Sequence, residues 1–346
     1  MKINVVSETA YMIKGNGVHT AFVDHVELLN SNPNVQVLVN NEGKGEVMHS
    51  HTYGLYYFLK GLRYRRRRVF TAHVIPESMQ GSFPLWKTWM PLVKWYLRQV
   101  YSYADVCLAI SPRVEEAIKE TGAKTKIVRL YNPIPAERWK RTEQKRKEGR
   151  KFLGLKESDF VVLGVGQLQA RKGVEDFMDV AKVLPEARFV WAGGRPFGAF
   201  TEGVSRINDR IAETEGKNIQ FTGMLDLDMM PLVYAAADLM LFPSYQENCP
   251  LAPIEAAACG MPVVFRKLPE YQTLYETEYL KADTTAEFIE ITRSMMSNTG
   301  ELKAGEIISE KLIQQFDKEH ILNKLLNVYE SLIPYKENSK YRWAMN

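Results

Sequence analysis

Short apolar runs alternate with amphipathic segments along the chain. A strand buried on both faces forms a nearly continuous apolar run, whereas a helix shows apolar residues three or four positions apart. In the first part of the chain, the predicted strands are Lys2–Val6, Val35–Val39, Val69–Ala72 and Ala104–Ile110. The predicted helices there are Val18–Asn30, Gly54–Arg63, Pro84–Tyr103 and Arg113–Thr121. This alternation predicts a parallel sheet covered by helices.

The alternation stops near the middle of the chain and then restarts. Asn132-Pro-Ile-Pro135 breaks regular structure, and a charged stretch from Arg138 to Lys151 continues the break. With 346 residues, the chain is long enough for two domains that each bury a core. The predicted strands after the break are Phe160–Gly166, Arg188–Gly194, Asn218–Gly223 and Leu239–Phe242. The predicted parts are two domains, 1–135 and 156–320, a linker, 136–155, and a C-terminal helix and tail, 321–346.

One stretch of the second domain carries two carboxylates close to a predicted strand end. The strand Leu239–Phe242 ends at Pro243, which leaves Glu247 in the following loop. Pro253 starts a helix and puts Glu255 in its first turn. Ligands of parallel sheets bind beyond the carboxyl ends of strands, where carboxylates accept hydrogen bonds from hydroxyl-rich molecules. On spacing alone, a solvated loop glutamate and a helix glutamate favoured by the dipole explain the pattern equally well.

The two glutamates are followed by a helix of small residues and by Gly260-Met-Pro-Val-Val264. This arrangement resembles the donor site of retaining glycosyltransferase family 4, whose α/β fold is GT-B, two Rossmann-like parallel-sheet domains facing across a cleft. The resemblance implies that Glu247 contacts the hydroxyls of the donor sugar and Glu255 the nucleotide ribose. Asn248 departs from the Gly or Ala that is usual in the family. The other donor-site residues implied in this stretch are Asn248, Cys249, Pro250 and Leu251.

A basic pair follows the first strand of the second domain. Arg171 and Lys172 stand in the loop after that strand. The resemblance implies that this pair binds the donor diphosphate and stabilises the leaving group by positive charge; the alternative is a solvated pair in a turn. Gly166 and Gly193 end predicted strands on the same side and belong to the implied donor site. Because Gly164-x-Gly166 lacks the third glycine of the dinucleotide fingerprint, we predict no nicotinamide site.

Two features of the first domain add to this site. Gly15-Asn-Gly17 precedes a predicted helix, and a glycine loop at a helix N-terminus can bind anions through backbone amides. The resemblance implies that Gly15 and Gly17 lie near the donor phosphates and the acceptor. His73 follows the strand Val69–Ala72, where the family often has a histidine beside the donor sugar. The alternatives are a simple turn for the glycines and a structural role for His73.

Charge is divided unevenly along the chain. Residues 1–150 contain 24 Lys and Arg against 13 Asp and Glu, a net charge of +11, whereas the remainder contains 21 against 28, a net charge of −7. A basic domain favours an acidic partner, either anionic lipid or nucleic acid. No segment resembles an established nucleic-acid-binding module, so we predict no nucleic-acid partner.

Two segments of the first domain favour lipid. The run Arg63-Tyr-Arg-Arg-Arg-Arg68 precedes a strand, and Pro84–Tyr103 is an amphipathic helix with tryptophans and cations, which suits a bilayer interface. Each cation near anionic lipid adds about 1 kcal/mol. The alternatives are a solvated charged face and tryptophans packed in the core. The cations predicted to meet an anionic membrane surface are Arg63, Arg65, Arg66, Arg67, Arg68, Lys87, Lys94 and Arg98.

Cysteine usage and apolar segments bear on location and metal content. Cys107, Cys249 and Cys259 are widely spaced, which argues against a disulfide framework and a zinc site and fits a reducing cytoplasm. The first apolar run is too short for a signal peptide, and no run reaches membrane-spanning length. We therefore predict a cytoplasmic protein, peripheral on the inner face of the bacterial cell membrane. Asp226-Leu-Asp228 is similar to a metal-binding motif, but its position suits helix capping, so we predict no metal.

These expectations combine into one predicted activity. The Gln246–Pro250 version of the motif is most similar to that of bacterial diglycosyldiacylglycerol synthases. The resemblance implies retaining transfer of a second α-hexose from UDP-galactose or UDP-glucose to glucosyldiacylglycerol, without a cofactor, and a C-terminal helix that crosses back to the first domain. The alternatives are a capsule or teichoic-acid glycosyltransferase using another lipid-linked acceptor, and a catalytically silent protein that binds sugar nucleotide or lipid.

Overall fold

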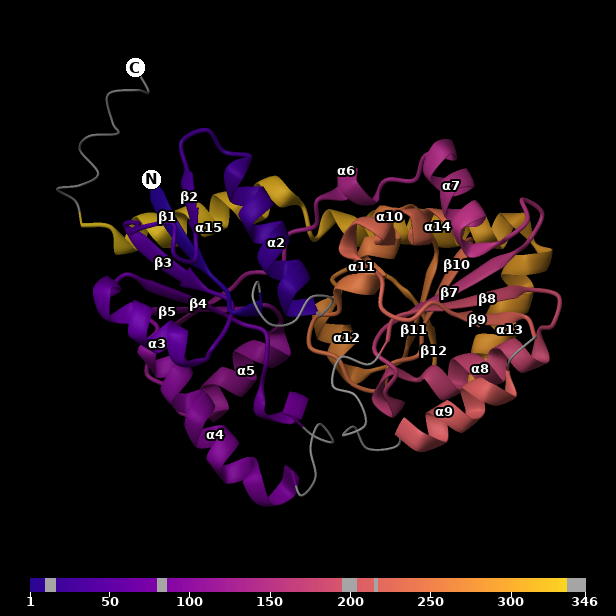
Figure 1. Ribbon diagram of the computed structural model, residues 1–346, viewed down its shortest axis with the longest axis horizontal. Coiled ribbons are helices and arrows are strands. Elements are labelled where there is room, and N and C mark those ends of the chain that lie inside the picture. Colours follow the sequence, from indigo (N-terminus) through magenta and orange to yellow (C-terminus); the bar gives the residue numbers. More distant parts are fainter. Residues whose placement is uncertain (10–16, 80–85, 195–203, 215–216, 335–346) are drawn as a thin grey trace. The chain divides into compact units, whose positions relative to one another are not determined.

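The computed structural model describes residues 1–9, 17–79, 86–194, 204–214 and 217–334. These residues form two compact α/β units (Figure 1). Of the described residues, the first unit contains 1–9, 17–79, Lys87–Pro133 and 316–334, and the second contains Trp86 and the described part of Ile134–Gln315. Each unit holds a six-stranded sheet, and the paired strands are parallel, as the alternation of apolar and amphipathic segments predicted.

The first sheet has the strand order β2-β1-β3-β4-β5-β6. Its strands are β1 (Lys2–Val6), β2 (Gln36–Val39), β3 (Val47–Ser50), β4 (Arg68–Ala72), β5 (Val106–Ala109) and β6 (Lys126–Arg129). The helices around it are α2 (Gly17–Asn30), α3 (Leu55–Gly61), α4 (Trp86–Tyr103), α5 (Pro112–Glu120) and α15 (Lys318–Leu332), with 3-10 turns η1 (Leu62–Tyr64) and η2 (Pro76–Met79). Strand β1 has the predicted bounds because its apolar residues Ile3 and Val5 are fully buried in the core.

Strand β3 is absent from the sequence-based prediction. Its residues Val-Met-His-Ser are half polar and give no apolar run, yet all are buried because β3 lies between β1 and β4. His49 is satisfied there by the hydroxyls of Tyr329 at Nδ1 and Thr71 at Nε2, each at 2.6 Å. Partners far away in the sequence therefore allow polar residues at the centre of the sheet.

The second sheet has the strand order β12-β11-β10-β7-β8-β9. Its strands are β7 (Val161–Val165), β8 (Arg188–Ala192), β9 (Ile219–Phe221), β10 (Leu239–Phe242), β11 (Val263–Arg266) and β12 (Leu280–Ala282). The helices around it are α6 (Ala136–Trp139), α7 (Glu143–Leu153), α8 (Val174–Val183), α9 (Val204–Glu213), α10 (Met230–Ala236), α11 (Leu251–Ala258), α12 (Pro269–Leu274), α13 (Thr285–Ser297) and α14 (Thr299–Gln314), with turns η3 (Ala170–Lys172) and η5 (Leu227–Met229).

The segment 136–155 is not the predicted linker, because it forms α6 and α7 within the second unit. Helix α7 packs on α10 so closely that a Cβ on Gly149 would overlap the carbonyl oxygen of Leu232. Arg150 is fully buried and donates to Asp238 at 3.0 Å. Burial of this charge is tolerated because it is paired, and the charge pattern alone does not reveal the pairing.

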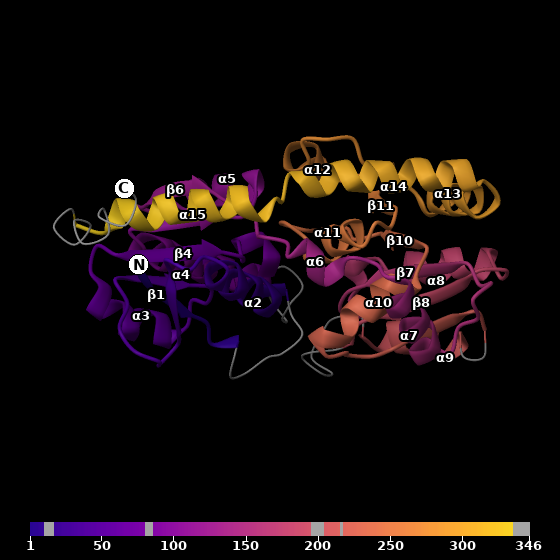
Figure 2. The ribbon, with the colours of Figure 1, turned by 90° about the horizontal axis from the view of Figure 1, so that it is seen from above.

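Helix α15 belongs to the first unit although it follows the whole second unit in the sequence (Figure 2). Ile321, Leu325 and Tyr329 of α15 are buried in the core of the first unit. The helix therefore completes a core that begins with β1. Among the helices that the structure describes, none combines the length and apolarity needed to cross a bilayer.

Candidate active site

The predicted residues of the second unit gather at one edge of its sheet. Strand β7 lies in the middle of the sheet, with β8 on one side and β10 on the other. The chain thus leaves β7 in one direction and returns on the other side at β10, and ligands of such sheets bind beyond this switch point. Arg171 and Lys172 follow β7, and Glu247 follows β10, so both loops end at this point.

The two loops are joined by their backbones. The carbonyl oxygen of Arg171 accepts from the Tyr245 amide at 2.8 Å, and the Ser244 Oγ lies 3.0 Å from the same oxygen. Gly173 has φ +70°, and a Cβ there would overlap the carbonyl oxygen of Pro243. Glycine is required at this position, since it alone allows both the backbone conformation and the close approach.

Lys172 and Glu247 form an ion pair between these loops. Their side chains are 15% and 9% exposed, and the Ser244 hydroxyl donates to the same Glu247 Oε1 at 2.6 Å. Burial lowers the pKa of Lys172, Glu247 opposes this effect, and the neighbouring Arg171 adds to it. The structure therefore brings together two residues that the sequence analysis assigned separately, one to the diphosphate and one to the sugar.

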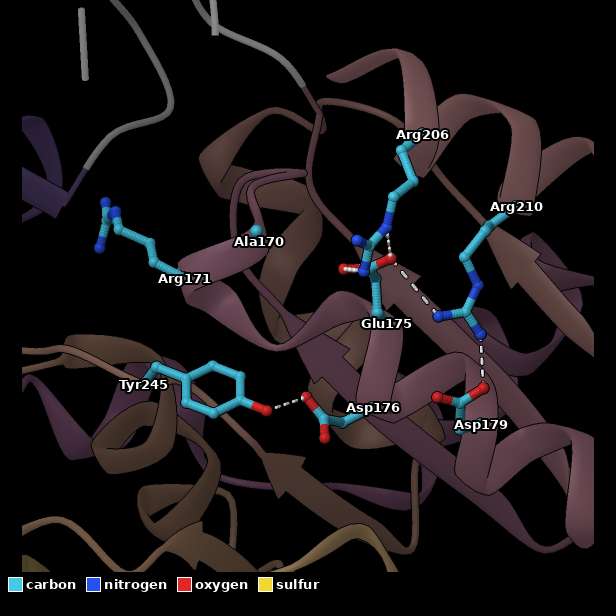
Figure 3. A pocket seen from close by; sticks show the side chains of 8 residues that line it. All are labelled: Ala170, Arg171, Glu175, Asp176, Asp179, Arg206, Arg210 and Tyr245. Carbon is cyan, nitrogen blue, oxygen red and sulfur yellow. Dashed lines mark hydrogen bonds and ion pairs between the residues drawn. The ribbon is translucent and has the colours of Figure 1, made fainter. Parts of the chain in front are cut away.

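Arg171 is one of the residues that line a cavity of about 480 Å³ beside these loops (Figure 3). The Arg171 Nε donates to Gln169 at 2.9 Å, and the guanidinium points away from the ion pairs of the cavity. Those pairs join Glu175 to Arg206 at 2.8 Å and Asp179 to Arg210. The arginines of these pairs are already bound to carboxylates, so Arg171 is the lining cation better suited to bind an anionic ligand.

Tyr245 and Arg266 hold the loop after β10 in place, although the sequence analysis did not identify them. The guanidinium of Arg266, a buried residue, lies 3.9 Å from the Tyr245 ring centre, and the Arg266 Nε donates to the Pro243 carbonyl at 2.8 Å. Tyr245 donates to Asp176 at 2.9 Å (Figure 3). This set fixes the backbone that leads to Glu247.

Glu255 differs in position from the prediction. Helix α11 begins at Leu251, so Glu255 lies in its second turn, and the side chain is buried. The Tyr234 hydroxyl donates to Glu255 Oε2 at 2.6 Å. Burial raises the pKa of Glu255 to about 7, and the bond from Tyr234 opposes the rise.

We expect Glu255→Gln to stabilise the protein more at pH 8 than at pH 5. Because the folded-state pKa is raised, the folded protein holds the proton of Glu255 over a range in which the unfolded chain has lost it. The unfolding free energy therefore falls between about pH 4.5 and 7, by about 3 kcal/mol. Thermal unfolding of the wild type and the variant at both pH values measures the difference. An equal shift in Tm at both pH values would contradict the raised pKa, and Glu290→Gln, at an exposed site on α13, is the control.

The remaining predicted donor-site residues lie at the same sheet edge. Gly193 follows β8, and a Cβ there would overlap the carbonyl oxygen of Gly166, which follows β7. Asn248 is half-buried, whereas Cys249, Pro250 and Leu251 are buried. The buried side chains pack the loop, so a ligand would meet the backbone of this stretch rather than their side chains.

Tyr271 is a buried polar residue near the site. It lies in α12, is fully buried, and its hydroxyl has no partner among the described residues. Burial raises the pKa of Tyr271 and the charge of Glu247 adds to the rise, which indicates that the two side chains are near each other. A helix-like spacing of Tyr271, Tyr275 and Tyr279 is the only signal in the sequence, and it does not distinguish core from site.

In the first unit, His73 follows β4 and is half-buried. Its Nε2 lies 3.0 Å from Nδ1 of His51, and burial lowers the pKa of His73 to about 3. Gly17 begins α2, and a Cβ there would meet no described residue within 4 Å. Gly15 and the side chain of Lys87 lie outside the described residues.

The predicted role of Asp226 as a helix cap is not realised. Asp226 stands at the N-cap position of η5, but the part of the chain that the structure describes shows no capping hydrogen bond from its side chain. Asp228 lies within the same turn. Both carboxylates belong to a short helical turn, and neither joins the ion pair at the sheet edge.

The basic run and the tryptophan helix of the first unit pack together. Helices α3 and α4 meet through Tyr103, whose hydroxyl donates to the Phe58 carbonyl at 2.7 Å. Trp89 and Trp95 are 52% and 58% exposed, so the alternative of tryptophans packed in the core is wrong for these two. We group them with the exposed leucines and cations of the same segments under the name basic apolar surface. Its members are Leu55, Leu59, Leu62, Arg63, Arg65, Arg66, Trp89, Leu92, Lys94, Trp95 and Arg98.

Arg68 does not belong to this surface. Its guanidinium donates to Asp105 at 3.0 Å and lies 4.2 Å from the centre of the Tyr103 ring. The charge is therefore already paired inside the unit, and the predicted membrane contact for Arg68 is revised. Arg67 is half-buried and is also left out of the surface.

Sequence comparisons cover almost the whole chain. Residues 33–138 match the model of Glycosyltransferase Family 4, and residues 145–299 match that of Glycosyl transferases group 1. The chain is 31% identical to the alpha-galactosylglucosyldiacylglycerol synthase of Streptococcus pneumoniae, over 95% of this chain and 89% of the relative. It is 26% identical to the processive diacylglycerol alpha-glucosyltransferase of Acholeplasma laidlawii, over 97% of this chain and 100% of the relative.

Solved structures support the fold. HepE of Anabaena in complex with UDP-glucose has a TM-score of 0.74 at 18% identity, covering 96% of this chain and 100% of that chain. The sucrose-phosphate synthase of Thermosynechococcus elongatus also has a TM-score of 0.74, at 17% identity, covering 96% of this chain and 99% of that chain. At these identities the likeness concerns the fold, which is GT-B.

Proposed function

The chain belongs to glycosyltransferase family 4, and from this premise we propose that it transfers a hexosyl group from UDP-galactose or UDP-glucose to glucosyldiacylglycerol, with retention of configuration. The two curated relatives carry the names of diacylglycerol glycolipid enzymes and match this chain over nearly its full length, which supports the acceptor class. The observation that carries the proposal is the pairing of Lys172 with Glu247 at the switch point of the second sheet.

In the proposed reaction, a hydroxyl of the acceptor lipid attacks the anomeric carbon on the face from which UDP departs. The bond from that carbon to the diphosphate oxygen breaks as the new glycosidic bond forms, and a diphosphate oxygen takes the hydroxyl proton. Arg171 and Lys172 stabilise the charge of the departing UDP. Glu247 accepts hydrogen bonds from the hexose, which positions the anomeric carbon. No metal or cofactor is part of the proposal.

Glu255 holds the ribose in this proposal. Tyr234 bonds to Oε2 of Glu255, and we assign Oε1 as the acceptor for a ribose hydroxyl. His73, in the first unit, contacts the hexose. The backbone from Asn248 to Leu251 and the glycines Gly166 and Gly193 allow the nucleotide to approach the sheet edge.

The basic apolar surface brings the enzyme to its acceptor in this proposal. Exposed tryptophans and leucines, together with exposed arginines for which no ion pair is seen in the described part of the chain, suit the interface of an anionic bilayer, with apolar side chains at the acyl boundary and cations at the headgroups. The proposed location is thus peripheral, on a membrane that carries the acceptor lipid.

The first test is product analysis. Incubation with UDP-glucose or UDP-galactose and glucosyldiacylglycerol in anionic vesicles, without added metal, should give an α-linked dihexosyl lipid. Mass spectrometry identifies the product, and the coupling of the anomeric proton reports its configuration. A β-linked product would contradict retention. Slow hydrolysis of UDP-sugar without a lipid product would support the donor site but contradict this acceptor, and would favour a capsule or teichoic-acid precursor as acceptor. If neither reaction occurs, the chain would be a protein that binds sugar nucleotide or lipid without catalytic activity.

A further inference from the structure

Three buried histidines of the first unit bring their rings together beside its sheet. His49 lies in β3, and the amide of His51 donates to the Val6 carbonyl of β1 at 2.9 Å, so the extended backbone continues through His51. Residues two apart on a strand point to the same face, which puts both rings on one side of β3. The ring of His25, from α2, has its centre 5.3 Å from that of His49 and 4.8 Å from that of His51. The three rings form one cluster, which we name the histidine trio.

The position of the hydrogen on His25 is fixed by the backbone. Nδ1 of His25 lies 3.3 Å from the carbonyl oxygen of Ala21, which can only accept a hydrogen bond. Nδ1 therefore carries the hydrogen, and Nε2 carries a lone pair. That Nε2 is buried and has no hydrogen-bond partner among the described residues. An imidazole that donates to a backbone carbonyl from one nitrogen and offers a lone pair on the other is the usual form of a metal-binding histidine.

His51 offers a second lone pair of this kind. Its Nδ1 lies 3.0 Å from Nε2 of His73, and its Nε2 is buried without a partner in the described part of the chain. A neutral imidazole holds one hydrogen, and a buried N–H without an acceptor is rarer than an unpaired acceptor. The hydrogen therefore belongs on Nδ1, toward His73, and the lone pair on Nε2.

His49 is the third member of the trio. One nitrogen of each of the three histidines lies within 4.8 Å of one nitrogen of the other two. Both nitrogens of His49 lie 2.6 Å from a hydroxyl, Nδ1 from that of Tyr329 and Nε2 from that of Thr71. To bind an ion, His49 has to release one of these hydroxyls, and the other then accepts the remaining N–H. Each histidine of the trio thus keeps an outer hydrogen-bond partner, as histidine ligands of metals do.

The two buried lone pairs need a partner, either a trapped water or a cation. A buried water usually makes about three hydrogen bonds, whereas His25 and His51 offer it two acceptors and no donor. A metal ion needs only lone pairs, and neutral imidazole is a common ligand of Zn²⁺. Burial lowers the pKa of His25 to about 4 and that of His51 well below its ordinary value, so both nitrogens are unprotonated at pH 7. Nitrogens bound to one zinc ion at about 2.1 Å lie about 3.4 Å apart, so inward rotation of the rings brings the trio to coordination distance.

We propose that His25, His49 and His51 bind one divalent transition-metal ion, Zn²⁺ before others, as a structural site of the first unit. All three side chains are at most 1% exposed, so the site is closed and the ion is taken up as the unit folds. A water molecule or the hydroxyl that His49 releases completes four-coordination. The sequence-based argument against a metal considered the cysteines and Asp226-Leu-Asp228, not the histidines. The ion takes no part in hexosyl transfer, so this inference does not depend on the proposed function.

The metal content of the wild type is the first test. Untagged protein expressed in zinc-supplemented medium and desalted should carry about one zinc ion per chain by elemental mass spectrometry. EDTA should remove the ion slowly from the folded protein and at once in guanidinium, because unfolding opens the closed site. A wild type without a stoichiometric transition metal would overturn the proposal and leave a trapped water as the partner of the two lone pairs.

Refolding and a matched pair of variants distinguish the trio from an ion bound elsewhere. Wild type unfolded with EDTA and refolded with zinc should have a Tm about 5 °C above that of wild type refolded with EDTA. His25→Gln should lose both the ion and this difference, whereas His320→Gln, at an exposed site on α15, should keep both. Equal Tm in the two refolded wild-type samples, or a His25→Gln protein that retains the ion, would contradict the proposal. None of these measurements uses UDP-sugar or lipid, so a failed hexosyl transfer assay bears on the proposed function alone.

Discussion

Replacing Glu247 with glutamine should lower kcat for hexosyl transfer by about a hundredfold to a thousandfold. The carboxylate is almost fully buried and shares its Oε1 with Lys172 and Ser244. The amide cannot balance the charge of Lys172, so the pKa of that residue should fall further and less ammonium should face the diphosphate. A single substitution thus weakens both the positioning of the hexose and the stabilisation of the leaving group.

Kinetics with UDP-hexose and glucosyldiacylglycerol in vesicles measure this loss. Lys172→Met should lower kcat by a factor of the same order. In the double variant, kcat should fall by much less than the product of the two single-variant factors, because the two residues act as a pair. The control is Glu115→Gln on α5, which removes a carboxylate paired with Lys119 of the same helix and Arg129 of β6. Binding to vesicles should not change, since Glu247 lies in the second unit and the basic apolar surface lies in the first. A Glu247→Gln enzyme with normal kcat would show that the pair is only structural.

Neutralising Arg63, Arg65 and Arg66 together should weaken binding to anionic vesicles by about a hundredfold. The three side chains belong to the basic apolar surface, and cations near anionic lipid contribute about 1 kcal/mol each, or about 3 kcal/mol in all. Hydrolysis of UDP-sugar in the absence of lipid should be unaffected. Vesicle sedimentation measures the partition, and high salt should weaken the binding of the wild type in the same direction.

A control variant that loses the same three positive charges elsewhere tests whether vesicle binding depends on the position of the charges or only on the net charge. Lys303, Lys311 and Lys324 are exposed cations on α14 and α15, outside the basic apolar surface. Their replacement by glutamine removes the same charge and should leave vesicle binding close to that of the wild type. If the two triple variants bind equally, the basic apolar surface is not the membrane contact.

Features that depend on neighbours in the sequence could be predicted. The apolar run before Pro243 gives β10, and it follows directly that Glu247 lies in a loop at the strand end. The small-residue helix after Pro250 was also expected, although its start at Leu251 put Glu255 one turn further along than predicted. Periodicity and turn chemistry decide these elements, and both act over a few residues.

Features that depend on residues far apart in the sequence could not be predicted from it. Lys172 and Glu247 are 75 positions apart, and the sequence gives no sign that they pair before a ligand arrives. The exposure of Trp89 and Trp95 is equally hidden, because an amphipathic helix with apolar residues on several faces fits a core or a surface. Which face is covered depends on the packing of α3 against α4.

The order of synthesis gives α15 a consequence for biogenesis. Its buried residues complete the core of the first unit, and its Tyr329 closes the hydrogen-bond set of His49 in the middle of that sheet. The ribosome releases these residues only after the whole second unit has been made. The main segment of the second unit, Ile134–Gln315, is continuous in the chain and can fold while translation continues, whereas the first unit must wait with an incomplete core. A nascent chain stalled before Lys318 would expose that unfinished core to chaperones and proteases, so synthesis of α15 is the step that commits the first unit to its native state.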